Sequence, residues 1–145
     1  MSFENYFEMS VKMFRSMTTG LFLYPLFVAL SESFDLNTHY YLPLDSVIRI
    51  GTVFLIISMI FFPLAKYSSA LLARGVKNPD RLGKKLFISY ILAVGCSETV
   101  AVFGLVIYIV TADVRFFYLF FILAFVHLIL HRPKKPDWQK HLDRI

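Results

Sequence analysis

The amino-acid sequence predicts an all-α integral membrane protein with four transmembrane helices. Of its 145 residues, 57% are hydrophobic and 17% are aromatic, and the mean hydropathy is +0.63. This composition is too apolar for an ordinary soluble domain of that length. Apolar runs of about twenty residues recur along the chain. Each is long enough to cross a hydrocarbon core of about 30 Å at a helical rise of about 1.5 Å per residue.

The apolar runs define a transmembrane domain that is flanked by two polar segments. The predicted spans are residues 13–30, 47–72, 86–110 and 114–130, within a transmembrane domain of residues 13–131. A polar loop, a basic loop around Asn78-Pro79 and a short turn separate the spans, and Arg132-Pro133 ends the fourth span. The remaining residues form an N-terminal segment, 1–12, and a basic tail, 132–145.

The N-terminal segment is amphipathic. Phe3 and Phe7 recur at helical spacing, with Glu4 and Glu8 on a neighbouring stripe. The segment has two interpretations, which differ only by a bend: a helix lying in the membrane interface, or an extension of the first span. A cleavable signal peptide carries basic residues where these two glutamates stand, so we expect the first helix to be retained.

Basic residues are distributed unevenly along the predicted path of the chain. Of the 15 lysine and arginine residues, all except Arg49 and Arg115 lie before the first span, around the middle loop or after the fourth span. Because basic residues favour the cytoplasmic side of a membrane, we expect both termini and the middle loop to be cytoplasmic. The protein is then a multi-pass protein of the cell (inner) membrane.

Charge and cysteine content argue against several classes of function. The formal net charge is +5, but the basic residues flank apolar spans, where they set orientation and contact anionic lipid, so we expect no nucleic-acid binding. The single cysteine, Cys96, allows neither an intramolecular disulfide nor a cysteine metal cluster. The sequence has no HExxH motif, phosphate loop or plausible set of nucleophile, base and acid. We therefore expect no enzymatic activity, cofactor or metal site.

Glu98 is the residue that most clearly indicates function. It lies near the middle of the third predicted span, roughly 18 Å from either end, where an acidic side chain costs roughly 2.5 to 3.5 kcal/mol. At neutral pH such a carboxyl is either protonated or paired with a cation. It is suited to binding a proton or Na⁺, with the hydroxyls of Ser97 and Thr99 as supporting groups. Alternatively, each hydroxyl bonds the preceding turn of backbone.

A row of small residues runs beside Glu98 at helical spacing. Its members are Ser89, Ala93, Ser97, Ala101 and Gly104. Small residues let helix backbones approach closely in a membrane, so we expect another helix to lie against this row.

Other polar residues are weaker candidates. His127 lies three residues before the end of the fourth predicted span, roughly 10 Å in depth from Glu98. It is predicted to be an interfacial histidine, with proton relay as the alternative. Arg49, Glu32 and Asp35 are predicted to lie together at the outer surface, where a rim ion pair would contribute little.

The basic tail is predicted to contact anionic headgroups, with docking of a protein as the alternative. The residues concerned are Arg132, Lys134, Lys135 and Trp138.

Residues 78–108 resemble the proteolipid c subunit of rotary ATP synthases. In that family a helical hairpin has a cytoplasmic loop with a basic residue, Asn or Gln, and Pro, matched here by Lys77-Asn78-Pro79, and its second helix carries the ion-binding carboxylate. The resemblance implies that Glu98 is an ion site. The second span departs from the family's glycine ladder, because it contains only Gly51. The chain also resembles small four-span bacterial membrane proteins with such a glutamate helix, a resemblance that implies no activity.

Two functions follow from these observations. The first is a non-enzymatic membrane subunit of a larger complex, surrounded by lipid and by other homo- or hetero-oligomeric membrane subunits, in which Glu98 binds or relays a proton or Na⁺. The alternative is a structural or assembly protein, in which a neutral Glu98 forms a hydrogen bond with a neighbouring helix and no ion is transported.

The predicted topology can be tested with reporter fusions. Reporters placed after Lys77 and after Ile145 should both respond as cytoplasmic, because both sites lie in segments rich in lysine and arginine. Opposite sidedness at the two sites would contradict the four-span prediction.

Overall fold

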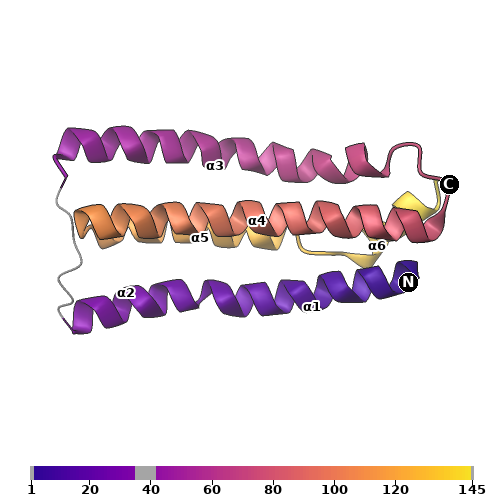
Figure 1. The fold of residues 1–145 in the computed structure, drawn as a ribbon, viewed down its shortest axis with the longest axis horizontal. Coiled ribbons are helices and arrows are strands. Elements are labelled where there is room, and N and C mark those ends of the chain that lie inside the picture. The colour runs from indigo at the N-terminus through magenta and orange to yellow at the C-terminus, as the bar shows by residue number, and fades with distance from the viewer. Residues whose placement is uncertain (1, 35–41, 145) are drawn as a thin grey trace.

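The computed structural model describes residues 2–34 and 42–144, and this part of the chain is helical, with no strand. Its helices are α1 (Phe3–Leu21), α2 (Leu23–Ser33), α3 (Leu44–Ala73), α4 (Pro79–Thr111), α5 (Val114–Leu130) and α6 (Lys135–Leu142). The long helices lie side by side in a bundle (Figure 1). The central helix is α4, which packs against α1, α3 and α5.

The helices place both ends of the chain at one end of the bundle. Figure 1 shows the start of α1, the connection between α3 and α4, and α6 together at this end, while the start of α3 and the turn between α4 and α5 lie at the other. As a result α4 runs parallel to α1 and antiparallel to α3 and α5. We call the first end the basic end, because the elements gathered there carry basic residues: Arg74 and Lys77 lie in the connection between α3 and α4, and Lys135 and Lys140 lie in α6.

Three to four of these helices are long and apolar enough to span a membrane. Residues Phe3–Ser33, Asp45–Ala73 and Pro79–Thr111 meet this condition, and α5 meets it when it is taken together with α6, which is bent from it by 49°. Large apolar side chains also face outward along the bundle, among them Leu23, Leu64 and Ile122. An exposed apolar surface of this extent is typical of a protein whose solvent is lipid.

The amphipathic segment at the N-terminus continues into the first predicted span. α1 runs unbroken from Phe3 to Leu21, and α2 follows after a break at Phe22. Pro25 explains the break, because a proline has no N–H for the carbonyl of the residue four positions earlier, here Leu21, and its ring clashes with that carbonyl. Pro63 is accommodated inside α3.

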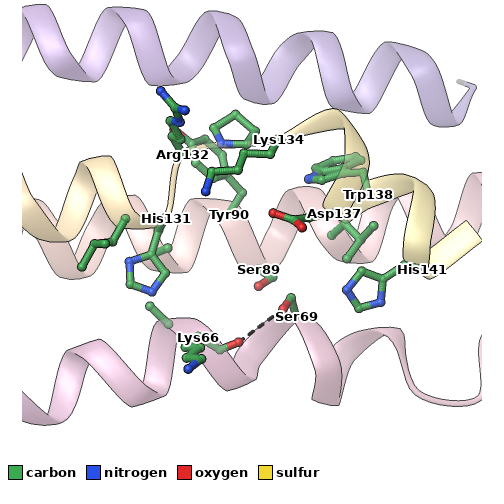
Figure 2. A pocket seen from close by; sticks show the side chains of 15 residues that line it. Lys66, Ser69, Ser89, Tyr90, His131, Arg132, Lys134, Asp137, Trp138 and His141 are labelled. Atoms are coloured by element: carbon green, nitrogen blue, oxygen red, sulfur yellow. Dashed lines mark hydrogen bonds between the residues drawn. The ribbon is translucent and has the colours of Figure 1, made fainter.

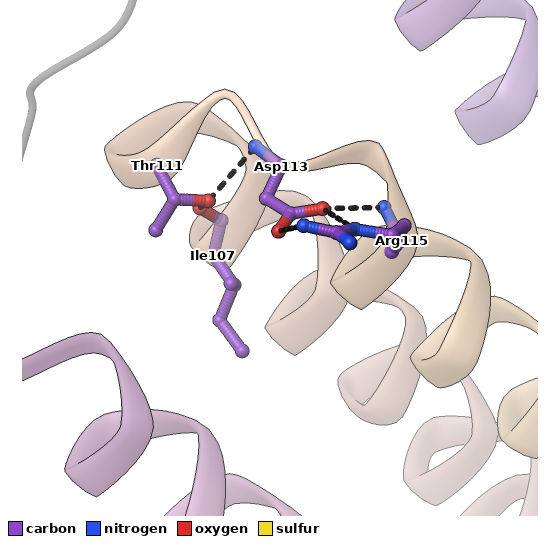
Figure 3. A network of polar contacts seen from close by, with 4 residues as sticks. All are labelled: Ile107, Thr111, Asp113 and Arg115. Carbon is purple, nitrogen blue, oxygen red and sulfur yellow. Dashed lines mark hydrogen bonds and ion pairs between the residues drawn. The ribbon is translucent and has the colours of Figure 1, made fainter. Parts of the chain in front are cut away.

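The connection between α4 and α5 is short and tightly bonded (Figure 3). The Thr111 hydroxyl donates to the Ile107 carbonyl oxygen (2.8 Å) and accepts from the Asp113 N–H (3.0 Å). The Asp113 carboxylate caps α5 by accepting from the Arg115 N–H (2.9 Å), and it pairs with the Arg115 guanidinium at 3.0 and 3.1 Å. The guanidinium hydrogen bond holds the pKa of Asp113 below its usual value. These contacts fix the start of α5 relative to the end of α4.

The row of small residues on α4 is buried against its neighbours. Ser89, Ala93, Ser97, Ala101 and Gly104 are all buried. At Gly104 the approach of α5 is closest, since a Cβ there would lie 2.8 Å from the Cβ of Phe120 and 3.0 Å from the carbonyl oxygen of Phe117. The missing side chain therefore allows contact between the α4 and α5 backbones.

This close approach can be tested by adding one methyl group. Gly104→Ala should lower the free energy of unfolding, measured by SDS titration in mixed micelles, by about 1–3 kcal/mol, because the methyl group would overlap α5. Gly95→Ala is the matched control, since a Cβ at Gly95 meets nothing within 4 Å. Equal stability of the Gly104 variant and the wild type would contradict the packing described here.

Candidate intramembrane site

Glu98 lies on the side of α4 that faces α2. Its side chain is half-buried, and its carboxylate interacts electrostatically with the phenol of Tyr24. Within residues 2–34 and 42–144, no side chain forms an ion pair or a hydrogen bond with this carboxylate. Glu98 is therefore an acidic group without a neutralising partner among the described residues of its own chain.

The two hydroxyls beside Glu98 are bonded to other groups. The Ser97 hydroxyl contacts Nδ1 of His127 at 2.6 Å and the Ala93 carbonyl oxygen at 3.1 Å, and the Thr99 hydroxyl donates to the Gly95 carbonyl oxygen at 2.9 Å. Successive residues of a helix point about 100° apart, so the residues before and after Glu98 do not share its direction. The structure therefore shows the alternative of the sequence analysis, in which each hydroxyl bonds the preceding turn of backbone, and it does not turn Ser97 and Thr99 toward Glu98.

His127 is buried inside the bundle at the level of Ser97, and not roughly 10 Å in depth from Glu98 as the sequence predicts. It is 0% exposed and lies level with Ser97, to which it is bonded. Both residues lie about 14 positions from the turn between α4 and α5, a rise of about 21 Å. The prediction was wrong because α5 is much shorter than α4. A place near the end of α5 is therefore still deep in the bundle.

The His127 ring joins three elements of the bundle. Its Nδ1 contacts Ser97 on α4, its Nε2 lies 3.3 Å from the Phe61 carbonyl oxygen on α3, and its ring meets Phe62 edge to face at 4.6 Å. The Ser97 hydroxyl also reaches Ala93. A neutral imidazole and a hydroxyl supply two hydrogens for these three polar contacts, whereas an imidazolium supplies the third. These contacts tie α3, α4 and α5 together at one level of the bundle.

Polar contacts continue from His127 toward the basic end. Nδ1 of His131 lies 2.8 Å from the His127 carbonyl oxygen, and the two rings are 4.3 Å apart. On the facing helices, the Ser68 and Ser89 hydroxyls bond each other at 2.5 Å. The sequence analysis missed both pairs, of which the first lies within one turn at the end of α5 and the second joins α3 to α4.

The tail residues that the sequence analysis grouped together have different surroundings in the structure. Arg132 and Lys134 are exposed, and Lys135 pairs with Glu4 at 2.8 Å. Trp138 is only 7% exposed, and its ring meets those of Phe3 and Phe7 edge to face at 5.6 and 5.4 Å. Trp138 therefore packs against α1, which corrects the expectation that it contacts lipid or a partner.

At the opposite end, Glu32 does not pair with Arg49. Glu32 accepts a hydrogen bond from the Tyr108 hydroxyl at 2.7 Å, while Arg49 forms no ion pair with any residue that the structure describes. Asp35, the third member of the expected rim group, lies outside the described residues. The described part of the chain also contains no group of three or more His, Cys, Asp or Glu residues suited to a metal ion.

The chain matches no protein family, no curated protein and no solved structure in the three comparisons. The geometry of these residues is therefore the basis for assigning a function.

The contact between Ser97 and His127 can be tested by removing one hydroxyl. Ser97→Ala should lower the free energy of unfolding by about 1–3 kcal/mol, because a buried ring nitrogen loses its partner. The matched control is Ser58→Ala, since Ser58 is also fully buried but bonds the Phe54 carbonyl oxygen of its own helix. SDS titration would measure both variants. Equal losses in the two would show that the bond between helices adds nothing.

Proposed function

We propose that this protein is a non-enzymatic membrane subunit of a larger complex, in which Glu98 binds or relays a proton or Na⁺. The observation that carries the proposal is that Glu98 is half-buried and has no ion pair or hydrogen bond among the described residues. A carboxylate at the centre of a membrane is costly unless a cation or a proton neutralises it. A proton, an ion or another subunit must then supply the partner that the described residues do not.

The depth of Glu98 supports this proposal. It lies thirteen residues from Lys85 and thirteen from Thr111 along α4, or about 20 Å from each. A hydrocarbon core is about 30 Å thick, so a bilayer centred on the apolar part of α4 places the carboxyl near its middle. The side chain of a glutamate is too short to reach either surface from there.

The surroundings of Glu98 favour a proton over Na⁺. A dehydrated hard cation needs several oxygen ligands, whereas the hydroxyls of Ser97 and Thr99 bond other groups. Tyr24 is the polar side chain that interacts electrostatically with the carboxylate. Na⁺ would therefore need ligands from another subunit, whereas a proton needs none.

We further propose four transmembrane helices in the inner membrane, with both termini in the cytoplasm. The fourth is α5 taken together with α6, because α5 alone has 17 residues and the bent pair, rather than α5 alone, is long and apolar enough to cross a membrane. The start of α1, the connection between α3 and α4, and α6 lie at the same end of the bundle. Basic residues gather at this end, as the positive-inside rule requires of a cytoplasmic surface.

The surface beside Glu98 also suits a second membrane helix. Gly95 is exposed, and a Cβ there would meet nothing within 4 Å, so another helix can approach closely one turn away from Glu98. This observation favours the alternative as well, a structural protein in which a neutral Glu98 bonds a helix of another subunit. In either case the surrounding molecules are lipid and other membrane subunits, with homo- or hetero-oligomeric partners.

Carbodiimide labelling in native membranes tests the proposal, since the reagent modifies protonated carboxyls in apolar sites. Mass spectrometry should find Glu98 labelled, and Glu98→Gln should abolish this adduct while preserving assembly. Glu32, which is hydrogen-bonded to Tyr108 near the opposite end, is the internal control. Suppression of labelling by Na⁺ would identify the ion as Na⁺.

The absence of labelling at every pH would instead contradict a functional ion site. It would favour the structural alternative, under which Glu98→Gln is nearly silent.

A further inference from the structure

A pocket of about 180 Å³ opens at the basic end of the bundle (Figure 2). It exists because α5 ends at Leu130, while α4 continues toward the basic end. The chain then crosses from α5 to α6 and leaves a space between α3, α4 and this crossing segment. The pocket does not involve Glu98.

Cationic side chains from two sides line this pocket. Figure 2 shows Lys66 coming from α3, and Arg132 and Lys134 from the crossing segment. Within the described ranges, none of these three forms an ion pair. The one acidic residue of the lining, Asp137, has Lys140 at 3.7 Å. The pocket is therefore positively charged, and three of its charges are unpaired in this part of the structure.

A buried hydroxyl at the pocket has no hydrogen-bond partner. Tyr90, which lines the pocket, is only 6% exposed, and its hydroxyl is buried without any bond. Because this hydroxyl has almost no accessible surface, Tyr90 contributes its ring, and not its hydroxyl, to the wall of the pocket.

The pocket continues into an apolar strip on the outside of the bundle. Leu130 belongs to the lining and is 61% exposed. From it, Val126, Ile122 and Leu119 follow along α5 at spacings of four, four and three, and all are exposed. These residues form one face of a helix. A ligand that fits both features has an anionic head and a long apolar body.

We propose that this pocket binds the headgroup of an anionic phospholipid. The phosphodiester lies among the cationic side chains of the lining, Lys66, Arg132 and Lys134, and an acyl chain follows the apolar strip of α5 from Leu130. Lysine and arginine bind phosphate through charge-assisted hydrogen bonds. Basic pockets between helices at the cytoplasmic side of a membrane suit such headgroups.

Native mass spectrometry of the delipidated full-length protein tests this site. Dioleoylphosphatidylglycerol should bind at least about tenfold more tightly than dioleoylphosphatidylcholine, which has the same chains and no net charge. Lys134→Gln and Arg132→Gln should each weaken the binding of dioleoylphosphatidylglycerol about fivefold, which is the effect of one basic residue near a phosphate.

The controls separate this pocket from general attraction between charges. Lys135→Gln removes the adjacent cation, which pairs with Glu4 and does not line the pocket, and lipid affinity should stay unchanged. Equal affinity for the two lipids, or equal losses in the Lys134 and Lys135 variants, would overturn the proposal. Displacement of the lipid by millimolar inorganic phosphate would overturn it too, because the site would then bind free phosphate.

Discussion

The close approach of α4 and α5 is the constraint on which the rest of the structure depends. Gly104 leaves no room for a side chain between its own backbone and Phe117 and Phe120. The hydrogen-bonded turn at Asp113 holds the end of α4 and the start of α5 at this distance. Because the pair is antiparallel, the contact near the turn also sets which residues meet further along. It brings His127 level with Ser97, and it determines where α5 ends beside α4.

The central helix has two polar environments at nearly the same depth. Ser97 points into the bundle, where the His127 ring and two backbone carbonyl groups surround its hydroxyl. Glu98, the next residue, points toward Tyr24 and remains half-buried. Bonds between helices satisfy the inner group and hold α3, α4 and α5 together. The outer carboxyl has no such role within the described chain, and for this reason we assign the proposed ion chemistry to Glu98.

The unequal lengths of α4 and α5 give the basic end its architecture. α4 has 33 residues and α5 has 17, so the chain leaves α5 while α4 still continues. The crossing segment then places Arg132 and Lys134 across the pocket from Lys66. α6 follows with a bend of 49° from α5, and Trp138 packs against Phe3 and Phe7. The same basic tail thus contributes a buried anchor and a set of exposed cations.

The sequence by itself determined the helical class, the approximate extent of the apolar helices and the small-residue row on α4. These features repeat along a single helix, so hydropathy and spacing reveal them. Only the tertiary structure decided that Ser97 bonds His127, that Trp138 is buried and that Lys66 lies near Arg132. Each of these contacts joins helices that are far apart in the sequence. Which side chains meet depends on how far each helix extends past its neighbour and on which face of the helix is turned toward that neighbour. The hydrophobic period of a single helix carries no information about either.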